Sequence, residues 1–113
     1  MNDCLFCKIA ASEIPVQIVL ETESALAFRD IDPQAPTHVL VIPRKHFADA
    51  QEIAQHDPKL AGELLALAAQ VAEQEGLTNG YRIVTNTGSD GGQSVGHVHF
   101  HVLGGRSLTW PPG

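Results

Sequence analysis

The sequence predicts an α+β fold: an antiparallel sheet of about five strands with one long helix and one or two short helices. Three observations predict it. Five short β-prone segments occur along the chain, two pairs of them are separated by turn-forming residues, and one long segment has the apolar spacing of a helix. The 113 residues match the common size of one domain and contain no linker-like stretch, so we expect a single domain over residues 1–113.

The N-terminal part of the chain predicts a short helix followed by a hairpin. Asp3 can cap a helix over residues 4–10, because its side-chain oxygen can accept hydrogen bonds from the first free backbone N–H groups. Residues 18–21 and 25–29 flank the turn-forming residues 22–24, which is the pattern of two antiparallel strands joined by a tight turn. We therefore expect the first two strands to pair with each other.

The middle of the chain predicts a central strand and then two helices. Residues 38–42 form a strongly β-prone run, and residues 47–53 can form a short helix. The long helix begins at Asp57, a capping residue, with Pro58 in the first turn, where the missing proline N–H costs little. Gly76 stands where a helix often ends with a left-handed residue. One apolar face of this helix is expected to pack on the sheet.

The C-terminal third predicts a hairpin whose second strand carries three histidines. Residues 81–86 and 95–103 are the two strands, and the glycine-rich residues 87–94 connect them. The period of two in a strand sends the three imidazoles to one face and the alternating apolar side chains to the other. The histidines are His97, His99 and His101, and the apolar residues are Val98, Phe100 and Val102.

Charge and composition exclude several classes of protein. The chain has 7 Lys and Arg against 13 Asp and Glu, and the formal net charge of −6 argues against nucleic-acid binding, because affinity for phosphate backbones comes mainly from cations. No run of about 18 apolar residues and no signal-peptide pattern occurs, so we expect a cytoplasmic protein without a membrane partner. Arg44 and Lys45 form only a small cationic cluster, which we expect to be solvated surface.

Two cysteines lie close together near the N-terminus. Cys4 and Cys7 are three positions apart, and in a reducing compartment this spacing indicates a metal or redox pair rather than a structural disulfide. The alternative is that both are reduced and pack as small hydrophobic side chains.

Three histidines on one face admit two chemical interpretations: three ligands of a catalytic metal, or a nucleophile with supporting groups. A solvated polar face is the alternative without chemistry. The loop over residues 88–94 favours the nucleophile, because glycines let backbone N–H groups converge on an anion and an acidic protein needs such oriented dipoles to hold a phosphate. An ordinary hairpin connection is the other interpretation of the loop. Together the loop and the histidines favour phosphorus chemistry.

Residues 97–103 fit the signature in which three histidines alternate with apolar residues, and the chain resembles the histidine triad nucleotide hydrolases and transferases. The resemblance extends over residues 27–31, 33–38, 41–46, 91–95 and 104–113. These segments are similar specifically to the histidine triad nucleotide-binding branch, the purine nucleoside phosphoramidases. The fold and the site of that family are therefore expectations for this chain.

The resemblance implies a catalytic group without a catalytic metal. The ring of His99 is the expected nucleophile, and the main-chain carbonyl of His97 accepts the hydrogen bond that aims it. His101 is expected to donate to the phosphate or the leaving amine, with His38 behind it as a relay. Ser94 would hold the bridging or leaving atom.

The same resemblance implies a purine nucleotide site. The backbone of Gly92, Gln93 and Ser94 and the side chain of Asn86 would hold the phosphate, and Asp30 would bind the ribose hydroxyls. The remaining nucleotide-binding residues are Val95 and Trp110 and, around the purine, Phe6, Ile14, Phe28, Ile31 and Leu40. From their residue types alone, the five residues around the purine would be assigned to the core.

The resemblance also implies a structural zinc and a dimer. Cys4, Cys7, His46 and His97 would be the ligands of a closed tetrahedral zinc site that ties the N-terminal helix to the sheet. The partner is a second copy, in a two-fold homodimer whose sheets join edge to edge and whose tails, residues 110–113, each approach the neighbouring site. A disordered terminus is the alternative for the tail.

The expected activity is that of an adenosine 5′-monophosphoramidase-type hydrolase. It would cleave the P–N bond of purine nucleoside 5′-phosphoramidates, and also aminoacyl-adenylates, through a nucleotidyl-histidine and release AMP or GMP. Three alternatives remain open: a dinucleoside polyphosphate hydrolase, a nucleotide-binding adaptor with incidental turnover, and a metallohydrolase that uses all three strand histidines.

Overall fold

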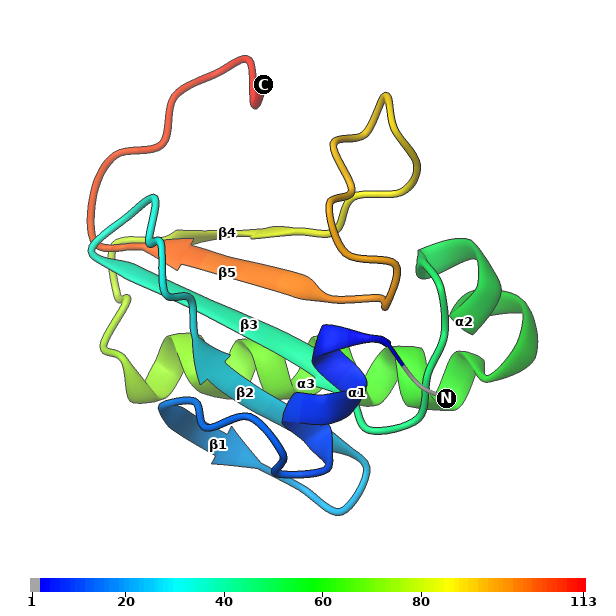
Figure 1. Cartoon of the computed structure of the whole chain (residues 1–113). Coiled ribbons are helices and arrows are strands. Elements are labelled where there is room, and N and C mark those ends of the chain that lie inside the picture. Colours follow the sequence, from blue (N-terminus) through cyan, green and yellow to red (C-terminus); the bar gives the residue numbers. More distant parts are fainter. Residues whose placement is uncertain (1–2) are drawn as a thin grey trace.

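The computed structural model describes residues 3–113 and confirms the α+β fold class (Figure 1). A five-stranded antiparallel sheet carries a long helix on one face and a short helix on the other. None of the helices formed by residues 3–113 has the length and apolar character of a transmembrane span. Within that part of the chain the elements are α1 (Leu5–Ala10), β1 (Ile18–Glu21), β2 (Ala25–Arg29), β3 (Thr37–Pro43), α2 (Ala50–His56), α3 (Pro58–Gln74), β4 (Tyr81–Val84) and β5 (Phe100–Gly104).

The strands run in the order β1-β2-β3-β5-β4, and every neighbouring pair is antiparallel. β3 is central, as its β-prone sequence predicts, and pairs with β2 on one side and β5 on the other. The register places Leu40 opposite His101 and His38 opposite Leu103. Strand pairing therefore brings the middle of the chain beside the histidine segment near its end.

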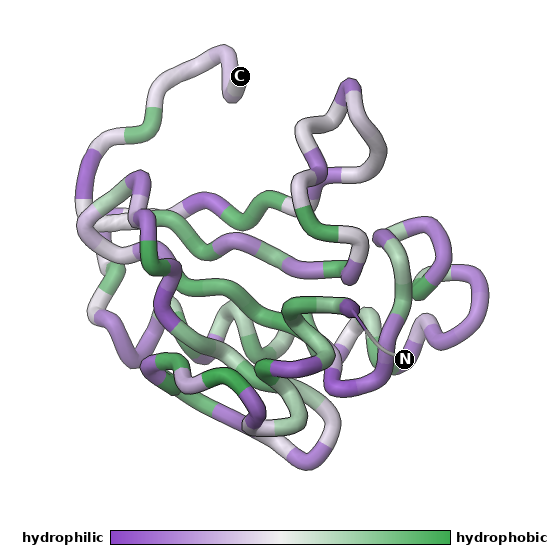
Figure 2. The backbone as a smooth tube through the Cα atoms, viewed as in Figure 1, coloured by the Kyte–Doolittle hydropathy of each residue, from purple (hydrophilic) through white to green (hydrophobic). Residues whose placement is uncertain are grey.

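Each face of the sheet has its own apolar core, because side chains alternate along the central strands. Val39 and Val41 point to the face covered by α3, and Leu40 and Ile42 to the face covered by α1. Figure 2 shows hydrophobic residues concentrated in these strands, whereas the outer turns are mostly hydrophilic. The predicted apolar side of the histidine segment is confirmed: Val98 and Val102 belong to the α3 core and Phe100 packs against it.

The capping signals of the long helix are confirmed. The carboxylate of Asp57 accepts a hydrogen bond from the Leu60 N–H (3.1 Å), and Pro58 is the first helical residue. Gly76 has a φ of 71°, the left-handed conformation that glycine adopts at little cost. The short helix before it starts later than predicted, at Ala50, because Asp49 is its capping residue.

The first helix and the last hairpin differ from the predictions in detail. Cys4, not Asp3, is the capping residue of α1, and its Sγ accepts a hydrogen bond from the Cys7 N–H (3.4 Å). β4 ends at Val84 and β5 begins only at Phe100. The prediction that all three histidines lie on a strand is therefore wrong for the first two.

Long-range hydrogen bonds explain why the last strand starts late. The Val98 N–H donates to the carbonyl of Phe47 (2.7 Å), in the segment before α2. The Thr85 hydroxyl donates to the carbonyl of His99 (2.9 Å). These partners replace the sheet ladder and hold an irregular segment in place before β5 begins.

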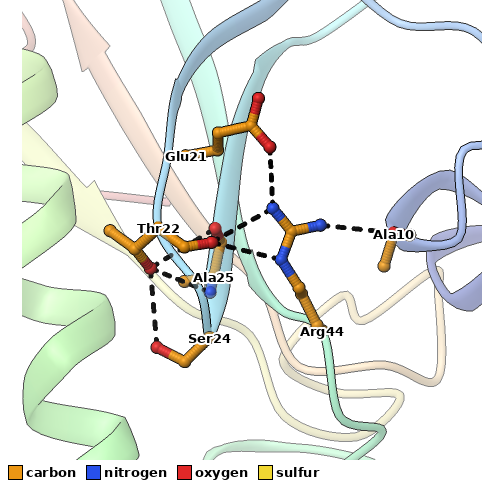
Figure 3. Close-up of polar contacts among 6 residues, drawn as sticks. All are labelled: Ala10, Glu21, Thr22, Ser24, Ala25 and Arg44. Carbon is orange, nitrogen blue, oxygen red and sulfur yellow. Dashed lines mark hydrogen bonds and ion pairs between the residues drawn. The ribbon is translucent and has the colours of Figure 1, made fainter.

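Arg44 is not the solvated surface residue that the sequence predicts. Its guanidinium donates to the Glu21 carboxylate (2.8 Å), to the carbonyl of Thr22 (3.1 and 3.2 Å) and to the carbonyl of Ala10 (3.3 Å) (Figure 3). These acceptors belong to the end of α1, to the last residue of β1 and to the turn that follows it. The side chain therefore joins the N-terminal helix to the sheet.

Candidate active site

The site is built from the only polar side chains that are buried among residues 3–113. They are His38, His97 and His99. His38 comes from β3, and the other two come from the irregular segment before β5. A buried imidazole requires hydrogen-bond partners, and within residues 3–113 every buried side-chain nitrogen and oxygen has one. Those partners decide which ring nitrogen carries the proton.

The hydrogen bond of His99 assigns its tautomer. Its Nδ1 lies 2.8 Å from the main-chain carbonyl of His97, and because a carbonyl can only accept, Nδ1 carries the proton. In the neutral ring, Nε2 is then unprotonated and available as a nucleophile. The Phe6 ring packs edge-on against the imidazole, with 5.0 Å between the ring centroids, and restricts its orientation.

His38 and His101, which the resemblance predicts to act as a relay, form a directed hydrogen-bonded pair beside this ring. The Gln34 N–H donates to Nδ1 of His38 (3.0 Å), so the neutral His38 ring carries its proton on Nε2. That Nε2 lies 2.8 Å from Nδ1 of His101, which therefore accepts. The neutral His101 ring consequently keeps its proton on Nε2.

Burial keeps both relay imidazoles neutral. Desolvation, helped by the neighbouring His99 and His38, lowers the pKa of His101 from 6.5 to about 4, while Asp30 opposes the shift. Desolvation also lowers the pKa of His38, against the opposing charges of Asp30 and Asp32. The relay is thus uncharged at neutral pH in the free protein.

A pocket of about 320 Å³ opens on His99 and His101. Its wall is mostly apolar and comes from α1, the residues after α1, and strands β2 and β3. All five predicted purine contacts line it, together with the predicted ribose ligand, the last residue of the glycine-rich loop and the residue that follows it. These lining residues are Phe6, Ile14, Phe28, Ile31, Leu40, Asp30, Ser94 and Val95. The structure therefore gathers eight of the predicted nucleotide-binding residues around the histidine pair.

The other predicted nucleotide-binding residues do not line this pocket. They are Asn86, Gly92, Gln93 and Trp110. The N–H groups of Gly92 and Gln93 donate to carbonyls within the loop, at Ser89 (3.1 Å) and Gly88 (3.0 Å). Trp110 lies in the extended C-terminal tail, with 83% of its surface exposed.

The side chain of Gln93 instead holds the loop in place. Its Nε2 donates to the carbonyls of Ala48 (2.7 Å) and Val95 (3.0 Å), and its Oε1 accepts from the Gly88 N–H (3.0 Å). Gly91 is also required for this conformation, because a Cβ there would lie 2.5 Å from the carbonyl oxygen of Thr87. The loop is therefore a folded unit attached to the segment before α2.

The predicted metal ligands also converge. The side-chain donor atoms of Cys4, Cys7, His46 and His97 all lie within 4.8 Å of one another. Nδ1 of His97 is 3.3 Å from Sγ of Cys4, 3.4 Å from Sγ of Cys7 and 3.2 Å from Nδ1 of His46. Because Nε2 of His97 donates to the carbonyl of Pro43 (2.9 Å), its Nδ1 has a lone pair directed at the cluster.

Comparison with known proteins matches residues 11–108 to the HIT domain, a family named for its histidine triad. The chain belongs to the HIT family. An uncharacterized HIT-like protein of Synechococcus elongatus is 54% identical to it over 112 residues. The alignment covers 99% of this chain and 98% of that protein.

Solved structures of HIT proteins have the same fold. A HIT family hydrolase from Legionella pneumophila is 54% identical, with a TM-score of 0.94 over 98% of this chain and 100% of that one. A histidine triad nucleotide-binding protein from Candida albicans is 32% identical, with a TM-score of 0.84 over 96% and 83% of the two chains.

The donor set of this HIT protein fits a tetrahedral zinc ion. Zinc bonds of about 2.3 Å to sulfur and about 2.0–2.1 Å to nitrogen place neighbouring ligand atoms about 3.3–3.8 Å apart. The measured separations of 3.2–3.4 Å are close to these values. Two thiolates and two imidazoles also form a closed ligand set, typical of a structural site rather than a catalytic one.

A second group of donor atoms, from Asp30, His38 and His101, suits proton transfer better than metal binding. A metal on Nε2 of His38 would require the proton to move to Nδ1, where it would face the Gln34 N–H. The three triad rings of this HIT protein also serve different partners. His97 faces the cysteines, His101 faces His38, and His99 lines the pocket, so a single metal shared by all three is disfavoured.

Several functional contacts were missed by sequence reasoning because they involve backbone groups or distant partners. They include the Gln34 N–H that orients the relay, the Thr85 hydroxyl on the carbonyl of His99, and the amide of Gln93. No local pattern marks these residues. Only the resemblance of residues 33–38 and 91–95 to the family indicated that two of these segments matter.

Proposed function

We propose that this HIT protein hydrolyses the P–N bond of purine nucleoside 5′-phosphoramidates, and also aminoacyl-adenylates, to release AMP or GMP. One observation carries the proposal. The hydrogen bond from Nδ1 of His99 to the carbonyl of His97 leaves Nε2 as an unprotonated nucleophile on a ring that lines an apolar pocket. The similarity to a HIT family hydrolase and to a histidine triad nucleotide-binding protein supports it.

In the first step, Nε2 of His99 forms a bond to the α-phosphorus while the P–N bond breaks. The His38–His101 pair, uncharged in the free protein, takes up one proton when the anionic substrate binds and passes it to the leaving amine, because an unprotonated amide ion is a poor leaving group. His99 keeps its Nδ1 proton throughout, and the carbonyl of His97 stabilises the positive charge that the nucleotidyl-imidazole acquires.

In the second step, water forms a bond to phosphorus and the P–Nε2 bond of His99 breaks. The proton of the attacking water returns to the His38–His101 pair, which restores the protonated pair of the substrate complex; the pair gives up this proton when the products leave. The net reaction adds one water and releases a nucleoside 5′-monophosphate and an amine. With an aminoacyl-adenylate, the same attack expels a carboxylate.

The pocket supports a purine nucleoside as the group that binds. Its apolar wall, which includes Phe6, Phe28 and Leu40, can cover both faces of a planar base. Asp30 lies at the same pocket and its carboxylate can accept hydrogen bonds from ribose hydroxyls. Ser94 lines the pocket together with His99 and His101, where its hydroxyl can donate to the phosphate or the leaving atom.

The direct test is to trap the intermediate. Denaturation during turnover of an adenosine phosphoramidate, followed by mass spectrometry of peptides, is expected to find one adenylyl group on His99. His99→Ala is expected to abolish turnover while nucleotide binding survives, and His56→Asn, at an exposed histidine, is the matched control. Unchanged turnover in His99→Ala would falsify the proposal.

The same assay separates the alternatives. Faster cleavage of dinucleoside polyphosphates than of phosphoramidates would favour the polyphosphate hydrolase. Nucleotide binding without turnover of either class would favour the adaptor. Activity that is lost on chelation and restored by added metal in proportion to its binding would favour a metallohydrolase.

We propose that the cluster of Cys4, Cys7, His46 and His97 holds a structural zinc, which would tie α1 to the segment before β5. One zinc per chain is expected by metal analysis of protein purified without chelator, and Cys7→Ser is expected to lose it. A metal-free preparation whose two thiols both react with a thiol reagent would contradict this assignment.

We also propose a homodimer that joins the sheets at β4. This strand has a neighbour on one side only, at β5, and its Tyr81 is exposed. The exposed Trp110 in the tail would then lie against the second copy. Sedimentation is expected to give twice the chain mass. A monomer at micromolar concentration would contradict it.

A further inference from the structure

We propose that Asp30, in addition to any contact with the ribose, is a positioning residue that stabilises the catalytic proton on the His38–His101 pair. This inference rests on the proposed function, in which that pair donates a proton to the leaving amine. It assigns one carboxylate two roles, recognition of the nucleoside and support of the acid. The argument starts from how the carboxylate is held.

The local structure divides the two oxygens of the Asp30 carboxylate between different tasks. Oδ1 accepts a hydrogen bond from the Asp32 N–H (2.8 Å), and the Asp30 N–H donates to the carbonyl of His38 (3.0 Å). Oδ2 lies 3.5 Å from Nε2 of His38. One oxygen therefore fixes the side chain and the other faces the relay.

The position is shielded enough for this charge to matter. The side chain of His38 is 5% exposed and that of Asp30 is 19% exposed. The donor atoms of His38, His101 and Asp30 all lie within 4.8 Å of one another. At such distances, away from bulk water, an attraction between opposite charges is screened less than it is at an open surface.

The tautomers explain why the relay needs a counter-charge. In the free protein, the single proton between the rings lies on Nε2 of His38 and points at Nδ1 of His101. When the pair takes up a second proton, Nδ1 of His101 also becomes a donor and the two N–H groups face each other. Oδ2 of Asp30 is then the acceptor toward which the His38 N–H can turn.

The surrounding charges single out this carboxylate. The titratable groups that face the pair are His99, Asp30 and Asp32. His99 would only add positive charge, and Asp32 is solvent-exposed, so its effect is weakened by water. Asp30 raises the pKa of both relay histidines against the effect of burial, which is the direction that a general acid needs.

The test combines a substitution with a change in the substrate. Asp30→Asn removes the charge but keeps an oxygen that can accept from the Asp32 N–H, so the turn is preserved. Asp32→Asn removes the same charge two residues away and is the matched control. Each protein is assayed with adenosine 5′-phosphoramidate and with its 2′,3′-dideoxy analogue, which has no hydroxyl for Asp30 to bind.

If Asp30 supports the proton, Asp30→Asn lowers kcat by about 10- to 100-fold on both substrates. As the pH is raised, kcat of Asp30→Asn also starts to fall at a lower pH than kcat of the wild type, because the pair gives up its proton more easily without the carboxylate. Asp32→Asn is expected to change kcat less than about threefold. If Asp30→Asn changes only KM, or has no effect on the dideoxy substrate, Asp30 binds ribose alone and the proposal is overturned.

A second readout needs no substrate. ¹⁵N NMR titration of the histidine rings in the free protein is expected to show lower pKa values for His38 and His101 in Asp30→Asn than in the wild type. Unchanged values would overturn the proposal even if turnover fell. Absence of wild-type turnover on both substrates would instead refute the proposed function, and the NMR titration would still decide whether Asp30 stabilises the proton.

Discussion

Acid is expected to destabilise this protein through the His38–His101 relay, and the half-buried His101 provides a measurable part of the effect. Its pKa falls from 6.5 to about 4 on folding, so between these pH values the unfolded chain binds a proton that the folded protein does not. The unfolded state therefore gains stability relative to the folded state as the pH falls. The contribution of His101 to the unfolding free energy is fully present above pH 6.5 and is lost as the pH decreases toward 4.

The size of the effect follows from the shift. A change of one pKa unit corresponds to about 1.4 kcal/mol, so acidification from pH 7 to pH 4 removes about 3 kcal/mol of unfolding free energy through His101. Burial also lowers the pKa values of His38 and His97, so both add to the loss in the same direction. The wild type is thus expected to lose more than the amount due to His101.

The measurement is urea unfolding at a series of pH values, with chelator present so that metal release does not contribute. His101→Asn removes the titrating group, so its unfolding free energy is expected to fall less steeply with acid than that of the wild type. The difference between the two curves isolates His101. Parallel curves between pH 7 and pH 4 would refute the conclusion that this ring is held neutral by burial.

Three substitutions test the packing. Arg44→Met is expected to lower the unfolding free energy by about 1–2 kcal/mol in urea, because three backbone or carboxylate acceptors lose their donor, whereas Lys45→Met should change it little. Gly62→Ala should raise it by about 0.5–1 kcal/mol, since the added methyl group in α3 would meet no side chain and no other element within 4 Å. Gly91→Ala should speed hydrogen exchange in residues 88–95, because the methyl group meets the Thr87 carbonyl; unchanged exchange would contradict this contact.

Elements whose signals lie within a few residues were predictable from sequence. Asp57 and Pro58 begin α3 because the cap and the first turn use only neighbouring atoms. The β-prone run at residues 38–42 became the central strand because both faces of that strand are covered and accept apolar side chains. The convergence of Cys4 and Cys7 with two distant histidines came from the resemblance and not from spacing.

The remaining features depend on partners far away in the chain. The three histidines alternate as a strand would, yet the Val98 N–H bonds to Phe47 and the sheet pairing begins only after His99. The glycine-rich loop has the composition of an anion site, but Gly92 donates its N–H within the loop. Periodicity and composition report local preference, and they do not record which distant acceptor a backbone N–H will meet.

His97 has a consequence for how mutagenesis of the triad is interpreted. Its imidazole belongs to the cysteine cluster, whereas its contact with the neighbouring His99 ring comes from the peptide carbonyl. Replacing the His97 side chain removes the imidazole from the cysteine cluster, but the carbonyl that bonds His99 remains in every variant. The three histidines look equivalent in the motif, but an alanine scan across them would compare different effects. Loss of His99 or His101 removes a ring that lines the pocket, whereas loss of His97 removes a contact that anchors the N-terminal helix.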